Sequence, residues 1–416
     1  MTIKFTRQLW LSGYLLVASA IPVYAAESPA SLSALAQRLL ESHPAYLAAQ
    51  AELDRASAQA RAAGQPLYNP EIEVEYEDAT DITRTLGLSQ TFDWSGKRRA
   101  SRKVGDASIR VAQASLAQIR QQLLTELLTG LSQLHTATAS ADLATRRISL
   151  LTEFLQLAKR RYAAGDIASS DVDLAQLALS EALMQAAVLN ADVSTARARV
   201  NALVTSPPAG WPALPDLPFA AATGSPEQWL EQLPAMRQAA AESAAAKASI
   251  QLAQKRRRAD PTLALRGGKE DDNTLIGVTA SIPLFVRNTF RSEVDAANAE
   301  AIRSEQRYYD LLRRARAEFQ STEQRYRLAR AALKDWQQSG QKSLHGRVRL
   351  LKQLWQTGEI DTTDYLVQLQ QTLDTESASV DLLRTTWQAW VAWLAASGQT
   401  ESWLGLAPDL RSNEFK

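Results

Sequence analysis

Glutamates occupy every second position in the stretch that runs from residue 71 to residue 77. They are Glu71, Glu73, Glu75 and Glu77, and they alternate with Ile72, Val74 and Tyr76. A period of two predicts a β-strand with one apolar face and one charged face. A row of carboxylates holds cations and disfavours anions. The other features of the sequence must explain why one whole face of this strand is acidic.

No other group of residues predicts an enzyme or a metal centre. The three histidines, His43, His135 and His345, lack metal-ligand spacing, and the chain has no Cys. Gly-rich phosphate loops and nucleophile motifs are missing from the sequence. We therefore expect no catalytic residue, no metal site and no cofactor. The formal net charge of +1 gives no reason to expect nucleic acid as a partner.

The N-terminus has the layout of a secretory signal peptide, expected over residues 1–25. Lys4 and Arg7 precede an apolar run from Leu9 to Ile21, and Ala25 ends a small-residue cleavage site. A membrane anchor is the alternative, but a run of about 13 apolar residues is too short to span a bilayer. No later stretch approaches 18 uncharged apolar residues, so we expect an exported mature chain without a transmembrane helix.

The mature chain is expected to be two tandem copies of one unit. The segment around Pro44 recurs around Pro234 at an offset of 190, and residues 161–171 recur as residues 354–364 at an offset of 193. Between the copies lie six of the chain's 15 prolines, which predicts an extended linker. The expected divisions are repeat 1 (26–204), the linker (205–226), repeat 2 (227–400) and a C-terminal tail (401–416).

Each copy is expected to contain a helix, two short strands, a very long helix and a returning helix. The expected ranges are 30–66, 70–78, 84–94 and 96–163 in the first copy, and 226–258, 262–269, 275–285 and 287–357 in the second. In the last of these, apolar residues recur every seven positions, which indicates coiled-coil packing. They are Leu312, Phe319, Tyr326 and Leu333.

All four predicted strands have an apolar face opposite a small or charged face. That alternation suits tilted strands that cross an outer membrane, with the apolar side to lipid and the polar side to a lumen. A soluble sandwich is the alternative, but four short strands leave little to pack against. Open strand edges in hydrocarbon would leave backbone groups unpaired, so the strands of several copies must close one barrel. Two copies give eight strands and a filled interior, whereas three give twelve strands and room for water.

The whole mature chain resembles the TolC family of outer-membrane efflux factors. The most specific features are the paired turns at 161–171 and 354–364, and the segment from Ser89 to Arg98 is similar to its counterpart in the heavy-metal (cobalt–zinc–cadmium) branch. The resemblance implies a mainly α-helical fold with a small membrane β part. Three copies would form an α-helical barrel and a twelve-stranded β-barrel in the outer membrane of a Gram-negative bacterium, without catalysis.

The resemblance also implies partners and sites. The partners are a periplasmic adaptor protein, an inner-membrane RND-type pump and outer-membrane lipid. The adaptor would dock at the hairpin tips, which are marked by Gly165, Asp166, Gly358 and Glu359. The periplasmic aperture would be lined by Asp364 and Asp171.

Local physical chemistry gives the same tips a structural role. Glycine allows the left-handed backbone that ends a helix, and Ser169-Ser170 and Thr362-Thr363 are expected to cap the returning helices. At three gating positions the chain departs from the family's residues, with Trp355, Ile360 and Val367. The resemblance therefore does not predict how this gate is held closed.

Two further clusters have more than one interpretation. Lys97-Arg98-Arg99 and the run from Lys255 to Arg258 lie at strand–helix junctions, where they would meet either anionic lipid headgroups or plain solvent. Trp387, Trp390 and Trp393 share a helical stripe, for which packing is favoured over a ligand site.

The glutamate parity sets the orientation of the first strand. Near the membrane midplane a lipid-facing basic residue costs about 2–4 kcal/mol and an acidic one somewhat less, so the four glutamates are expected to line the pore. The expected function is an exit duct of a tripartite efflux system that exports heavy-metal cations. A duct for drugs or for type I protein secretion is an alternative, and a periplasmic coiled-coil adaptor or scaffold is an alternative of another class.

Overall fold

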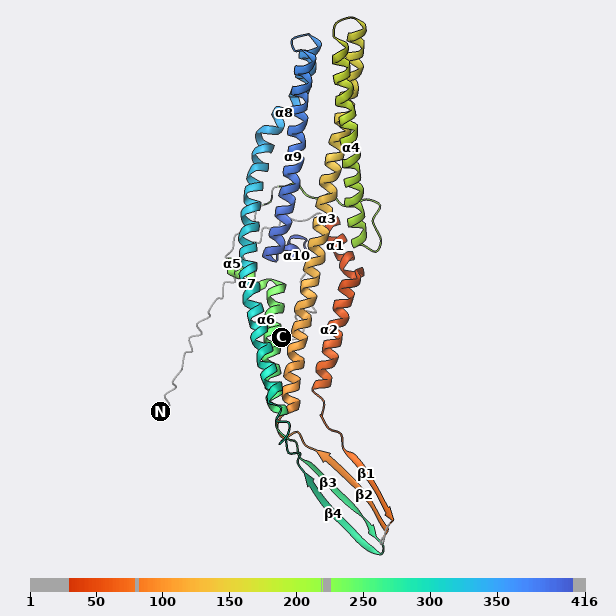
Figure 1. Ribbon diagram of the computed structural model, residues 1–416, viewed down its shortest axis with the longest axis vertical. Helices are drawn as coiled ribbons and strands as arrows, with labels where there is room; N and C mark the ends of the chain where they lie inside the picture. The colour runs from red at the N-terminus through yellow and green to blue at the C-terminus, as the bar shows by residue number, and fades with distance from the viewer. Residues whose placement is uncertain (1–29, 79–81, 218, 220–225, 407–416) are drawn as a thin grey trace, which may run out of the picture.

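The computed structural model describes residues 30–78, 82–217, 219 and 226–406, and these form a long helical body with a sheet at one end (Figure 1). The predicted signal peptide and the end of the predicted tail lie outside these residues. Repeat 1 holds α1 (Ala30–Ser42), α2 (Pro44–Ala63), α3 (Lys97–Ala163) and α4 (Ser169–Leu203). Repeat 2 holds α5 (Pro226–Gln232), α6 (Pro234–Arg256), α7 (Arg291–Asp335), the π-helical η1 (Trp336–Gly340), α8 (Gln341–Gln356), α9 (Thr362–Ser397) and α10 (Thr400–Trp403).

The helices that open the two repeats are each broken near their start, where one continuous helix was expected. The break falls at His43 in the first repeat and at Leu233 in the second, and both residues directly precede a proline. A proline disfavours the helical conformation of the residue before it, and His43 and Leu233 accordingly have ψ angles of 126° and 127°. Pro44 and Pro234 then begin the next helix, where a missing N–H does no harm.

The long helix of repeat 2 begins at Arg291 rather than at residue 287, and it contains the π-helical turn η1. Gly340 lies against the Trp336 ring, because a Cβ at Gly340 would fall 2.1 Å from the Trp336 Cε3 atom. The expected heptad spacing is confirmed along α7, where Phe319 and Tyr326 are buried in contacts between helices.

The main hydrophobic core lies midway along the body, where α1, α10 and the linker wrap the long helices (Figure 1). The tryptophan stripe of α9 is buried there, which confirms its packing role. Phe219 of the linker packs between Trp387 and Trp390, and its carbonyl oxygen accepts a hydrogen bond of 2.7 Å from the Tyr326 hydroxyl. Burial raises the pKa of Tyr326 above its ordinary value. The linker is therefore fastened to the helices.

One antiparallel sheet joins the two repeats. Its strands are β1 (Glu71–Asp78), β2 (Ile82–Thr91), β3 (Thr262–Glu270) and β4 (Asn273–Ser281), in the order β1-β2-β3-β4. β2 and β4 end earlier than expected, because Trp94 N–H turns back to the Phe92 carbonyl and Pro283 lacks an N–H to donate. Among the described elements, no helix lies over either face of the sheet (Figure 1).

The pairing of β2 with β3 depends on a glycine in β3. A Cβ at Gly268 would lie 1.9 Å from the Arg84 carbonyl oxygen, whereas a Cβ at Gly267 would meet nothing nearer than 3.9 Å. We predict that Gly268→Ala separates the strands at a cost on the order of 1–3 kcal/mol. The measurement is the fraction of protein that resists SDS as an assembled oligomer. Gly267→Ala is the matched control, and equal losses in both variants would contradict the prediction.

Candidate functional site

The sheet is a wall with two chemically opposite faces. The strand register places Glu71, Glu73, Glu75 and Glu77 on the same face as Thr85 and Ser89 of β2. Thr85 and Ser89 are buried beneath this acidic row, and the Thr85 hydroxyl donates a 3.0 Å hydrogen bond to Glu75. The opposite face is bare and apolar, with Val74 78 % exposed and Ile276 77 % exposed. The expected parity of the strands is confirmed, while the role of the glutamates as pore lining is a proposal taken up below.

A basic residue crosses the acidic face. Arg266 of β3 lies in register with Gly87 on one side and Gly277 on the other. A Cβ at Gly277 would lie 2.9 Å from the Arg266 Nε atom, so the glycine gives the arginine room to lie along the sheet. The Arg266 guanidinium is 3.8 Å from Glu75 and thereby offsets part of the negative charge of the row.

The register also adds a fifth carboxylate that sequence analysis placed in a loop. Glu270 is the last residue of β3 and lies opposite Thr83, which in turn lies opposite Glu77. Directly opposite residues of an antiparallel pair point to the same face, so Glu270 belongs to the acidic face. Alternation within β3 also places Glu270 on the face of Arg266, but the predicted strand ended one residue short, at residue 269.

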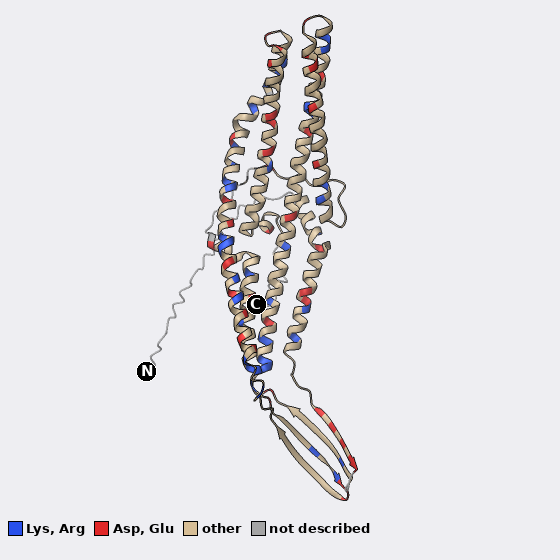
Figure 2. Ribbon diagram, viewed as in Figure 1, with Lys and Arg blue, Asp and Glu red and all other residues tan. Residues whose placement is uncertain are grey.

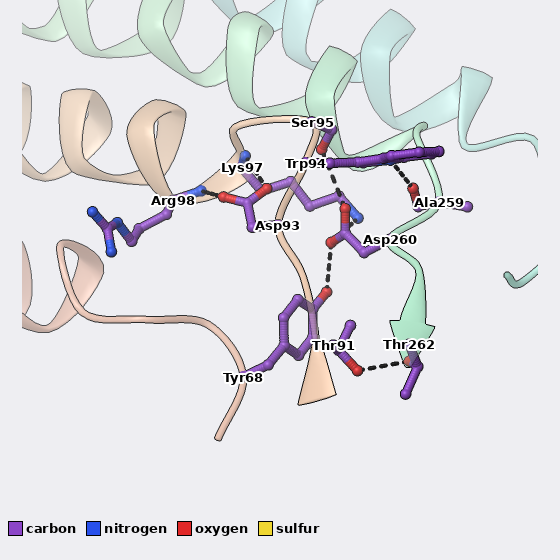
Figure 3. A network of polar contacts seen from close by, with 10 residues as sticks. All are labelled: Tyr68, Thr91, Asp93, Trp94, Ser95, Lys97, Arg98, Ala259, Asp260 and Thr262. Carbon is purple, nitrogen blue, oxygen red and sulfur yellow. Dashed lines mark hydrogen bonds and ion pairs between the residues drawn. The ribbon is translucent and has the colours of Figure 1, made fainter. Parts of the chain in front are cut away.

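Asp260 fastens the two repeats together where the sheet meets the helices (Figure 3). This carboxylate of repeat 2 is nearly buried, lies 2.9 Å from Lys97 Nζ and accepts a 2.8 Å hydrogen bond from the Tyr68 hydroxyl. Burial, and after it the hydrogen bond to Asp260, raises the pKa of Tyr68 to about 12. A buried charge that lost either partner would be strongly destabilising.

The neighbouring segment from Asp93 to Arg98 is also a structural joint. The Asp93 carboxylate accepts hydrogen bonds from the backbone N–H groups of Lys97 and Arg98, at 2.7 and 2.8 Å, and so caps α3. The Trp94 indole donates a 2.6 Å hydrogen bond to the Ala259 carbonyl oxygen (Figure 3). The segment from Ser89 to Arg98, which sequence analysis described only as similar to the heavy-metal branch, therefore has a structural role at this joint.

The far ends of the hairpins are closed by glycines in the left-handed conformation. Gly165 has a φ of 83° and Gly358 a φ of 79°, as expected. The N–H groups of the next residues, Asp166 and Glu359, donate back across the turn at 2.9 Å in both hairpins. All four residues are exposed, which leaves them accessible to a partner.

The expected helix caps at these turns are wrong. Ser169 and Thr362 are already the first residues of α4 and α9, so their hydroxyls cannot serve as N-caps. Carboxylates act there instead. Asp361 accepts a 2.7 Å hydrogen bond from the Asp364 N–H, and Asp171 accepts a 3.0 Å hydrogen bond from the Ala168 N–H. Asp171 and Asp364 thus lie in the first turns of the returning helices α4 and α9, in two different hairpins of the chain.

An aromatic cluster joins the two hairpins below their tips. Trp355 is 1 % exposed, and its ring lies 4.7 Å from Phe154 and 5.3 Å from Tyr365. Burial raises the pKa of Tyr365 to about 12. Arg161 of the first hairpin covers the Trp355 ring at 5.0 Å and donates a 2.9 Å hydrogen bond to the Trp355 carbonyl oxygen. Trp355, which stands where the family has a different gating residue, is therefore the centre of the contacts that join the two hairpins. We call these contacts the Trp355 tie.

The helical body with a two-faced sheet at one end has counterparts among known proteins. Within the described ranges, no group of three or more His, Cys, Asp or Glu side chains suits a metal ion. Residues 35–205 match the family described as "Outer membrane efflux protein". The fold matches the outer-membrane channel OprN with a TM-score of 0.76 at 19% identity, over 90% of this chain and 91% of that one. The chain is thus similar to outer-membrane efflux proteins, in sequence over residues 35–205 and in fold over most of its length.

Curated relatives of this chain are named as metal-resistance proteins. The nickel-cobalt-cadmium resistance protein NccC of Alcaligenes xylosoxydans xylosoxydans is 29% identical, over 66% of this chain and 65% of NccC. The cobalt-zinc-cadmium resistance protein CzcC of Cupriavidus metallidurans is 28% identical, over 65% of this chain and 67% of CzcC. The chain thus matches about two thirds of the length of these relatives.

The tie at Trp355 can be weakened without touching the aromatic core. We predict that Arg161→Ala loosens the hairpin ends, because it removes a cation–π contact and a charged hydrogen bond that together stabilise the tie by about 2–4 kcal/mol. Purified protein in planar bilayers should then show a higher open probability. Arg160→Ala, at the exposed neighbouring position, is the control. An unchanged open probability for Arg161→Ala would show that the tie does not restrain the tips.

Proposed function

We propose that three copies of this chain form the outer-membrane exit duct of a tripartite efflux system, which extends into the periplasm. The observation that carries the proposal is the sheet. Its bare apolar face suits lipid, its acidic face suits water, and the outer edges of β1 and β4 have no strand beside them in the described chain. In hydrocarbon such edges must be paired, and β1 of one copy can pair with β4 of the next. Three copies give twelve strands and an aqueous lumen.

A second surface supports assembly from copies of the chain. Contrary to the expectation from apolar run lengths, α4 is long and apolar enough to cross a membrane by length and composition. It lies along α3 instead, and its outer residues Leu177, Met184 and Val188 are between 62 and 67% exposed. Their spacing of seven and four is that of a helix-packing stripe. We assign this stripe to the contact between neighbouring copies in the helical barrel.

The partners follow from the two ends of the molecule. The exposed hairpin tips, Gly165-Asp166 and Gly358-Glu359, are the proposed docking points for a periplasmic adaptor, and Asp364 and Asp171 the proposed aperture. An inner-membrane RND-type pump would supply the energy, since the proposed duct is passive. Heavy-metal cations are the proposed cargo, supported by the names of the curated relatives and by the acidic wall. Organic compounds or secreted proteins are the competing cargo classes.

The acidic wall should make the duct cation-selective. We predict that replacing Glu71, Glu73, Glu75 and Glu77 with Gln shifts the reversal potential toward the anion side, because counter-cations are no longer held at the wall. The measurement is made in planar bilayers under a salt gradient. Arg266→Gln should move the reversal potential the opposite way. A selectivity unchanged by the fourfold substitution would refute the assignment.

The cargo is tested in cells. A deletion strain should become more sensitive to divalent cobalt, zinc, nickel or cadmium, and plasmid-borne wild type should restore growth. If only organic compounds became more toxic to the deletion strain, heavy-metal cations would be rejected as the cargo, and the proposed duct function would be unaffected. Extraction separates the duct from a scaffold, since a protein that salt alone washes off membranes is no channel.

A further inference from the structure

Basic residues gather where the sheet meets the helical body (Figure 2). Three chain segments, residues 93–103, 255–260 and 287–291, reach this junction at the helix and strand ends. They hold eleven Lys and Arg but only two carboxylates. Both carboxylates have structural partners, since Asp93 caps α3 and Asp260 binds Lys97. We call these three segments the basic collar.

Local contacts do not account for the charge of the collar. In the described part of the chain, no ion pair within 4.0 Å links Arg98, Arg99, Arg256 or Arg258 to a carboxylate, and all four are exposed. Helix electrostatics would favour cations only at the end of α6. Lys97, Arg98 and Arg99 lie instead at the start of α3, whose first turn holds no acidic residue, so the helix dipole disfavours them there. Asp93 caps the helix and Asp260 pairs with Lys97, so the guanidinium groups of Arg98 and Arg99 are the ones that an external anion would stabilise.

The collar directly follows an apolar and aromatic zone. Phe92 and Trp94 are 48 and 67% exposed, and Leu284 and Val286 after β4 are 78 and 81% exposed. These residues continue the bare face of the sheet toward the helices. An apolar wall, then aromatic side chains, then basic side chains is the order of hydrocarbon, interface and headgroup layer in a membrane.

We infer that the basic collar binds the phosphate groups of anionic phospholipid in the leaflet that faces the helical body. The inference rests on the proposed outer-membrane duct and adds a lipid class to it. The buried Asp260–Lys97 pair joins residues 93–103 to residues 255–260 (Figure 3). A 3.3 Å hydrogen bond from Arg257 Nε to the Thr289 carbonyl oxygen joins residues 287–291 to them, so the basic side chains of the three segments lie at one junction. The collar thereby fixes the depth at which the barrel lies in the membrane.

The test uses the full assembled protein, extracted from vesicles of phosphatidylethanolamine with one quarter phosphatidylglycerol. Native mass spectrometry measures how much phosphatidylglycerol the protein retains. The variant is Arg99→Gln with Arg256→Gln and Arg258→Gln. The matched control is Arg313→Gln with Arg314→Gln and Arg316→Gln, which removes the same charge from the exposed surface of α7. Circular dichroism and oligomer size confirm that both variants fold.

Wild type and control should retain phosphatidylglycerol in excess of its share in the vesicle. Each basic residue near an anionic surface strengthens binding roughly fivefold, so the collar variant should bind on the order of 100-fold more weakly. High salt should reduce the retention by wild type. Equal retention by the collar variant, or an equal loss in the control, would overturn the inference.

Two outcomes separate this inference from the proposed duct. In the first, wild type conducts in pure phosphatidylcholine and shows no preference for phosphatidylglycerol. This result would agree with the proposed duct and would overturn the inference that the basic collar binds anionic lipid. A collar variant with an altered reversal potential and unaltered lipid retention would also overturn it, because the arginines would then face the lumen. The absence of conduction in every lipid would instead refute the duct itself.

Discussion

Unpaired backbone groups cannot remain in hydrocarbon, and in the proposed outer-membrane duct the rest of the molecule depends on this constraint. Each unsatisfied N–H or C=O group there costs several kcal/mol, so a four-stranded sheet with two open edges is not viable alone in a membrane. In this fold, duplication of the unit reduces the number of open edges. Two hairpins from two repeats form one continuous sheet, and the pairing of β2 with β3 makes the repeats inseparable. In the proposed outer-membrane duct, the remaining edges would pair with other copies of the chain.

The junction beneath the sheet carries the mechanical consequence of that arrangement. A flat, uncovered wall has no hydrophobic core to hold it at a fixed angle to the helices. Polar groups take over this role, through the Asp260–Lys97 pair, the Tyr68 hydrogen bond and the Asp93 cap (Figure 3). At the other end of the body aromatic packing does the equivalent work, with Trp355 enclosed between Phe154 and Tyr365.

Sequence patterns predicted the features that one segment encodes by itself. The alternation in β1, the heptads of α7 and the glycines of the tips all follow from local periodicity or backbone freedom, and the structure has them. Features that depend on two distant segments were missed. Arg266 meets Glu75, and Arg161 meets Trp355, only because the repeats pack side by side. The caps of α4 and α9 were assigned to serines and threonines instead of Asp171 and Asp361, because sequence patterns locate a helix start only to within one or two residues.

The strand order has a consequence for how the negative charge is distributed around a closed barrel. Since four of the five glutamates of the acidic face lie on β1, each copy in the proposed barrel would present one file of carboxylates beside the seam with the next copy, while Glu270 lies apart on β3. Neighbouring files are then four strands apart, or about 19 Å along the wall, whereas glutamates within a file are about 7 Å apart. Screening acts over about 8 Å at physiological salt. In the proposed trimer, an ion close to one file would therefore interact with the members of that file together and only weakly with the other two files, so the lumen would offer three parallel tracks instead of a stack of charged rings.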